Sequence, residues 1–145
     1  MRELCEAIAD INLPLHIFIQ YIEDGGDVNI KFTCVGKHIS FCNDSLLSVL
    51  LFSQYYDYAL MLLKSDLDIE VNTVGDDGTT PLITLCAGYQ RNRKSNQPIM
   101  LEIAKILLEK GLKAETVDDL GQSAIIYCKL NGYFELATFL ETSTK

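Results

Sequence analysis

The feature that most constrains the fold of this chain is a pattern of helix-start and helix-end residues that recurs along it. Residues 118–140 read DDLGQSAIIYCKLNGYFELATFL, in which Ser123 precedes one apolar segment and Gly132 separates it from a second. Residues 78–82, GTTPL, repeat the start of the pattern, and residues 45–47, SLL, repeat it in a weaker form. Asn29, Asn72 and Glu115 occupy the same place in successive units and are 43 residues apart. A fixed period of this kind indicates a repeat architecture.

Several residues of the unit favour helix boundaries for physical reasons. Thr80 can accept a hydrogen bond from a free amide of the first helical turn, and Pro81 follows where its missing N–H costs nothing. Gly111 comes just after the apolar run Ile103 to Leu108, where a glycine with positive φ is typical. Asp66 takes the corresponding place in the preceding unit, and aspartate tolerates that conformation. Helices this short cannot each bury an apolar face alone, so we expect neighbouring pairs to stack in a linear array.

The pattern resembles the ankyrin repeat, in which a hairpin turn leads into two antiparallel helices. The D-x-x-G of that repeat falls on Asp118 and Gly121, and its G-x-T-P-L falls on residues 78–82. The resemblance implies an all-α fold, an ankyrin repeat solenoid of stacked helix–turn–helix pairs with projecting hairpin loops. It covers a single domain, 1–145, with repeats at roughly 1–29, 30–72, 73–115 and 116–141, of which the first two are degenerate.

The two middle units are longer than the family's. The usual ankyrin period is 33 residues, so each of them carries about ten more. Alignment of the units places most of the extra residues of the second unit at 30–44, and those of the third between its two helices, at 89–98. The histidine of T-P-L-H is also replaced, by Ser48, Ile83 and Ile126. The hydrogen bonds that tie neighbouring repeats together in the family must therefore be lost or remade.

Length and composition agree with one globular domain. A chain of 145 residues can bury roughly two-thirds of its unfolded surface, and 48% hydrophobic with 22% charged residues is ordinary for a soluble protein. The apolar run from Leu46 to Phe52 is far shorter than the roughly 18 residues of a membrane span. The first ten residues, MRELCEAIAD, include acids and lack the apolar core of a secretory signal. We therefore expect a cytoplasmic protein that does not enter a membrane.

The five cysteines are odd in number and scattered, which argues against a disulfide scaffold. Cys86 and Cys128 lie at or near a position where the ankyrin repeat has a small residue, so we expect them to be buried packing residues. Cys34, His38 and Cys42 are three zinc-type ligands, but the run lacks a fourth and matches no familiar finger spacing. We interpret it as part of an extended hairpin and expect neither a metal nor another cofactor.

Catalysis and nucleic-acid binding find little support in the residue types. Only His16 and His38 could serve as imidazole bases, and no phosphate-loop, dinucleotide, nucleophile-elbow or zinc-protease motif is present. The formal net charge of −8 repels a phosphate backbone. We therefore expect a protein that is not an enzyme and binds no nucleic acid.

Acidic residues concentrate in two turns, one before Thr80 and one before Ser123, where the first helices of the last two units are expected to start. In a stacked array these exposed turns lie side by side and form one acidic edge, which favours a partner protein with a basic surface. The same acids could instead serve solubility and turn formation. Ankyrin arrays usually bind through hairpin tips and exposed first-helix positions, so the resemblance implies the partner-binding residues Asp76, Asp77, Asp118, Asp119, Ser48, Phe52, Thr84 and Tyr127.

Tyr127 is the strongest candidate for an interface anchor, because it combines a large aromatic ring with a hydroxyl group. We expect the chain to be monomeric when free. Two functions remain open for it. One is a general adaptor or effector module, and the other is a dedicated inhibitor of the immunity-protein or antitoxin type that neutralises a basic toxin or enzyme. Small size, strong negative charge and the lack of a signal peptide or accompanying domain favour the inhibitor somewhat.

Overall fold

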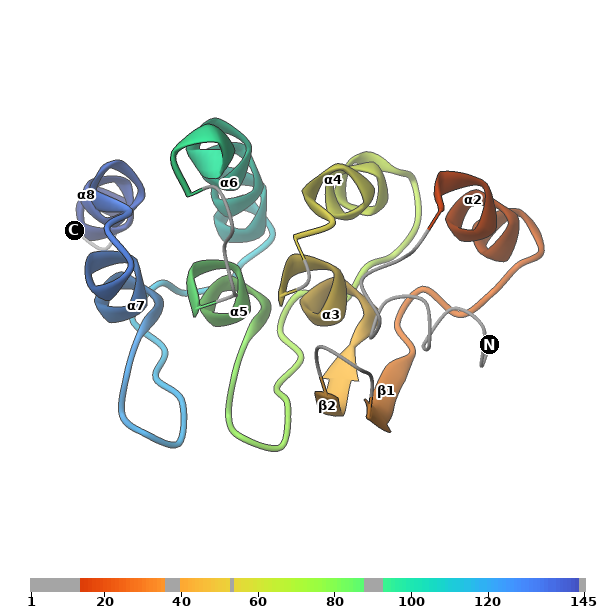
Figure 1. Ribbon diagram of the computed structural model, residues 1–145, viewed down its shortest axis with the longest axis horizontal. Helices are drawn as coiled ribbons and strands as arrows, with labels where there is room; N and C mark the ends of the chain where they lie inside the picture. The colour runs from red at the N-terminus through yellow and green to blue at the C-terminus, as the bar shows by residue number, and fades with distance from the viewer. Residues whose placement is uncertain (1–13, 36–39, 53, 88–92, 144–145) are drawn as a thin grey trace.

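A computed structural model gives the structure of the protein and describes residues 14–35, 40–52, 54–87 and 93–143, without the side chains of 32–35, 40–43 and 93–97 (Figure 1). Most of the described residues are helical, which confirms the prediction of a mainly helical fold. Within these ranges, none of the helices is both long and apolar enough to cross a membrane.

The helices form two layers (Figure 1). One layer holds α3, α5 and α7, and the other holds α2, α4, α6 and α8. Helices contact one another within each pair, and α3–α5–α7 and α4–α6–α8 contact along the layers. The elements are α2 (Leu15–Glu23), β1 (Lys31–Val35), β2 (Ser40–Ser45), α3 (Leu46–Phe52), α4 (Tyr56–Lys64), α5 (Pro81–Ala87), α6 (Arg93–Glu109), α7 (Ala124–Leu130) and α8 (Phe134–Ser143).

The first helix of each pair begins at a residue that caps it. The hydroxyl oxygens of Ser45, Thr80 and Ser123 accept hydrogen bonds from the amide three residues on, at 3.2, 3.3 and 3.4 Å respectively. Each bond satisfies one of the free N–H groups of a first helical turn. Gly132 has φ +80° in the turn between α7 and α8, and Gly111 has φ +104° after α6, as the sequence predicts.

The end of α4 differs from the prediction. Asp66 does not adopt a positive φ; among the described residues other than glycine, only Gln54, between α3 and α4, does so. Instead, α4 is closed by Ser65, whose hydroxyl donates to the carbonyl of Leu62 at 2.6 Å and accepts from the amide of Leu67 at 3.2 Å. A side chain that supplies both bonds removes the need for a left-handed residue.

The two insertions have different structures. Within 30–44, β1 and β2 pair as an antiparallel hairpin with an irregular register after Phe32, and this confirms the extended hairpin. In the third unit, α6 already begins at Arg93 and contains Pro98, so residues 93–98 lengthen a helix rather than form a loop. Proline lacks the N–H group that a residue inside a helix donates, so the sequence predicts that this helix starts after Pro98. The run Cys34, His38, Cys42 lies outside the described side chains.

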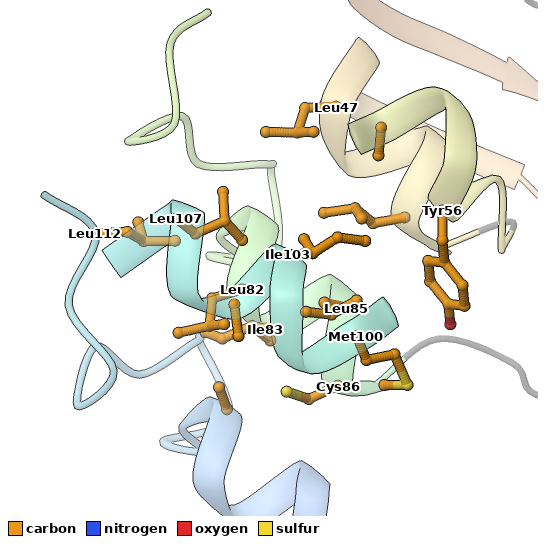
Figure 2. Close-up of a cluster of buried hydrophobic side chains, with 14 of the residues drawn as sticks. Leu47, Tyr56, Leu82, Ile83, Leu85, Cys86, Met100, Ile103, Leu107 and Leu112 are labelled. Carbon is orange, nitrogen blue, oxygen red and sulfur yellow. The ribbon is translucent and has the colours of Figure 1, made fainter. Parts of the chain in front are cut away.

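The core lies between the two layers. Figure 2 shows Leu82 and Leu85 of α5 gathered with Ile103 and Leu107 of α6, and all four side chains are fully buried. The prediction for the cysteines of the last two units is confirmed: Cys86 and Cys128 are both fully buried, and the thiol of Cys128 donates to the sulfur of Cys86 at 2.9 Å. These small side chains allow α5 and α7 to approach closely.

The side-chain amides of two asparagines link neighbouring units of the chain. Asn131, in the α7–α8 turn, donates from Nδ2 to the carbonyl of Cys86 at 2.7 Å. Asn29 donates from Nδ2 to the carbonyl of Asp68 and accepts at Oδ1 from the amide of Glu70, both at 2.8 Å. These side-chain-to-backbone bonds join segments of successive units.

Helix α2 lies at one end of the row (Figure 1) and buries a single residue, Phe18. The Phe18 ring stacks on Tyr58 of α4, with ring centroids 4.9 Å apart. Ile17, Tyr21 and Ile22 also pack against the core but stay partly exposed, so Phe18 is the most deeply buried residue of α2.

Candidate functional site

The turns that precede α5 and α7, at 75–78 and 118–121, lie directly against each other. The amide of Asp119 donates to the carbonyl of Asp77 at 3.1 Å. Gly78 has φ +80°, and a Cβ atom there would lie only 2.6 Å from Oδ1 and 2.9 Å from the amide nitrogen of Asp119. Only glycine satisfies both the conformation and the close approach. The sequence-based prediction of adjacent acidic turns is therefore confirmed.

Asp118 is not the exposed acid that the sequence analysis expects. Its side chain is buried, and Oδ1 accepts hydrogen bonds from the amides of Leu120 and Gln122, both at 3.0 Å. Oδ2 accepts a third from the hydroxyl of Tyr127 at 2.5 Å. This last bond, with the two amides, holds the pKa of Asp118 below its ordinary value. Asp118 thus stabilises its own turn, whereas Asp76, Asp77 and Asp119 are exposed.

Tyr127 is half-buried on α7, with its hydroxyl committed to Asp118. Burial of the phenol and then its hydrogen bond to Asp118 raise the pKa of Tyr127 to about 12. The ring is therefore held in one orientation by the turn that precedes it. A side chain fixed in this way loses little conformational freedom when a partner binds.

Ser48 and Thr84 are a second correction, because both are buried rather than exposed. Helix α5 lies between α3 and α7, and all of its residues from Pro81 to Cys86 are buried. The Thr84 hydroxyl donates to the carbonyl of Pro81 at 2.8 Å, and the Ser45 hydroxyl donates to the hydroxyl oxygen of Ser48 at 3.2 Å. Helices α3 and α7 lie on either side of α5, which carries Thr84, whereas α3, which carries Ser48, contacts α5 and the β1–β2 hairpin.

The predicted residues nevertheless meet in one place. A hollow of about 420 Å³ lies between the turns and the layer of α3, α5 and α7. Seven of the eight predicted residues line it, and Asp76 does not. Ser48 and Thr84 contribute to its wall from within the helix layer. The hollow is lined by Asp44, Ser48, Val49, Phe52, Asp77, Thr79, Thr84, Ala87, Asp118, Asp119, Leu120 and Tyr127.

The sequence analysis missed Asp44, at the end of the β1–β2 hairpin. A Cβ atom on Gly75 would lie 2.3 Å from Oδ1 of Asp44, so the hairpin closely approaches the 75–78 turn. Asp44 directly precedes the Ser45 cap, as Thr79 precedes Thr80, and both line the hollow. The position before the caps Ser45 and Thr80 was therefore the signal that could have found Asp44.

The hollow combines negative charge with apolar walls. Four of its lining residues are aspartates, and none of the twelve is basic. Lys129, the basic residue of α7, is paired with Glu141 at 2.6 Å. Phe52, Leu120 and the Tyr127 ring supply apolar surface beside these acids, and Leu120 is 78% exposed. The arrangement suits a positively charged group on an apolar stem.

The described part of the chain contains no cluster of three or more histidine, cysteine or acidic side chains that could hold a metal ion. The carboxylates of the hollow are therefore not gathered around a single point. No family model matches this chain, and no curated protein matches it either.

Proposed function

We propose that the protein is a non-enzymatic interaction module, an ankyrin-type repeat array that binds a partner protein through the hollow and the acidic turns beside it. The observation that carries this proposal is the convergence of seven residues, chosen for partner binding on the basis of repeat position, on one hollow. They come from three successive units of the chain, so no single helix pair provides the surface.

The ankyrin part of the proposal is supported by how the elements recur. Each of the ranges 30–72, 73–115 and 116–141 holds one pair of helices, and each first helix starts at a hydroxyl cap. The turns before α5 and α7 project from the same side of the layers (Figure 1). A unit that buries its apolar face only against its neighbours is typical of repeat proteins.

Two kinds of contact in this surface support different steps of binding. Exposed charges at the edge, Asp77 and Asp119, act on the rate of encounter with a basic partner. Aromatic side chains in the hollow, Phe52 and Tyr127, act on the rate of dissociation, because large rigid anchors contribute most of the affinity at interfaces.

The test begins with capture of a partner from the native cell and continues with association kinetics. We expect the pair Asp77→Lys and Asp119→Lys to slow association and to remove much of its salt dependence, while the helical spectrum is unchanged. Asp118 is left intact because it supports the fold. The matched control is Asp66→Lys with Asp68→Lys, two exposed acids outside the hollow that make the same change in net charge. Equal association rates for the two double variants would contradict the proposal.

A dedicated inhibitor is the second candidate, and the four aspartates around the hollow favour it. An acidic hollow is complementary to the basic active site of a nuclease-like toxin. A toxin-like reading frame next to this gene would favour the inhibitor. The decisive measurement is whether the captured partner is an enzyme whose activity falls to zero at one equivalent of this protein; an adaptor would leave that activity in place.

A further inference from the structure

We propose that the hollow receives an arginine side chain of the partner, with the methylene stem against the apolar wall and the guanidinium group among the aspartates. This inference rests on the proposed function and names the chemical group that the surface recognises. It follows from three properties of the hollow: its apolar wall, the placement of its carboxylates and its poor fit to a metal ion.

The wall suits a methylene stem. Phe52 of α3 and Ala87 of α5 line the hollow and are partly exposed, and Leu120 extends from the 118–121 turn. Long basic side chains pack their stems along apolar surface while the charged end stays among polar groups. A compact inorganic cation would leave this apolar surface without a partner.

The carboxylates approach from three different segments. Asp44 comes from the β1–β2 hairpin, Asp77 from the 75–78 turn and Asp119 from the 118–121 turn. Guanidinium presents five N–H donors in a plane and can bind carboxylates on more than one edge. An ammonium group has three donors on one nitrogen and is more strongly hydrated, so separated carboxylates select arginine over lysine.

Aromatic rings add to this selectivity. Phe52 and Tyr127 line the hollow from α3 and α7, on either side of α5. Guanidinium stacks on aromatic faces more readily than ammonium does. By contrast, calcium requires six to eight oxygen ligands around one point, and no such cluster exists among the described residues.

The direct test is an NMR titration with N-acetyl-arginine-N-methylamide at low salt, compared with the lysine and citrulline compounds. We expect saturable shifts confined to amides around the hollow, such as those of Thr84, Ala87 and Tyr127. Citrulline has nearly the same shape as arginine without its charge, and should cause no saturable shift. Equal binding of the arginine and lysine compounds, or shifts spread over the whole surface, would overturn the proposal.

Two variants then locate the site. Asp77→Asn with Asp119→Asn should weaken arginine binding roughly tenfold, the combined effect of two partly exposed ion pairs. Asp66→Asn with Asp68→Asn makes the same charge change outside the hollow and should bind as the unchanged protein does. Ala87→Leu fills the hollow without altering charge and should also abolish binding; undiminished binding by a folded Ala87→Leu variant would overturn the assignment.

The outcome separates this inference from the proposed function. A captured partner whose association depends on Asp77 and Asp119, together with no shift for the arginine compound, overturns the arginine site and leaves the interaction module in place. Saturable binding of the arginine compound, together with a captured partner that associates equally fast with the Asp77→Lys, Asp119→Lys variant and with its control, contradicts the proposed function at this surface and leaves only the affinity of the hollow for arginine.

Discussion

The two adjacent aspartates of the 118–121 turn should differ in how much stability they lose on the same substitution. Asp118 is buried and accepts three hydrogen bonds, whereas Asp119 is exposed and joins the neighbouring turn through its backbone amide. Alanine keeps the backbone amide and removes only the carboxylate. We therefore expect Asp118→Ala to destabilise the protein and Asp119→Ala to leave the free energy of unfolding within about 0.5 kcal/mol of its original value.

The magnitude follows from the three bonds. A hydrogen bond to a charged group contributes about 1.5–3 kcal/mol. All three bonds are only part-buried, so water can reach each donor once the carboxylate is removed, and the loss is smaller than the sum of the three bonds. The expected loss for Asp118→Ala is therefore about 2–3 kcal/mol. For a chain of this size that lowers Tm by roughly 4–12 °C.

Urea denaturation at several pH values gives the free energy of unfolding directly. The pKa of Asp118 is lowered in the folded protein, so its stabilising contribution is present above the unfolded-state pKa of about 4 and is lost as pH falls through the folded pKa. The difference between Asp118→Ala and the unchanged protein should therefore shrink in acid. Equal losses for Asp118→Ala and Asp119→Ala at neutral pH, or a gap independent of pH, would refute this reasoning.

Four further predictions concern other parts of the fold. Gly78→Ala should cost more stability than Gly121→Ala in urea denaturation, because both glycines have positive φ but only at Gly78 would a Cβ meet the next turn. Phe18→Ala should cost about 3–5 kcal/mol locally, and hydrogen exchange should show faster exchange in α2 with unchanged exchange in α7. Iodoacetamide should label Cys86 and Cys128 only after unfolding, as peptide mass spectrometry can resolve. Since burial raises the pKa of the Cys86 thiol, stability should fall as pH rises above about 8.5.

The helix boundaries could be predicted because they depend on local chemistry. Thr80 and Ser123 cap their helices with their own hydroxyls, and Gly132 takes the conformation that its turn requires. The early start of α6 was not predictable in this way, because Pro98 is unfavourable inside a helix and the sequence indicates a start after it.

The site was predicted in location but not in the role of each residue. Repeat position indicated which residues share a face, and this brought Phe52, Asp77 and Tyr127 together correctly. The exposure of Thr84 depends on the helices on either side, and the burial of Asp118 depends on which acid of an adjacent pair points into its turn. Both depend on how the chain packs in three dimensions, which the repeat pattern of the sequence does not describe.

The contact between Cys86 and Cys128 links the packing of the interior to the shape of the hollow. These sulfur atoms meet at 2.9 Å between α5 and α7, the helices that carry Thr84 and Tyr127 into the wall of the hollow. Because packed interiors transmit changes in side-chain volume rather than absorb them, a larger residue at either position would push the two helices apart and widen the hollow. Substitutions at these two buried positions would therefore change the width of the hollow without altering any residue that lines it.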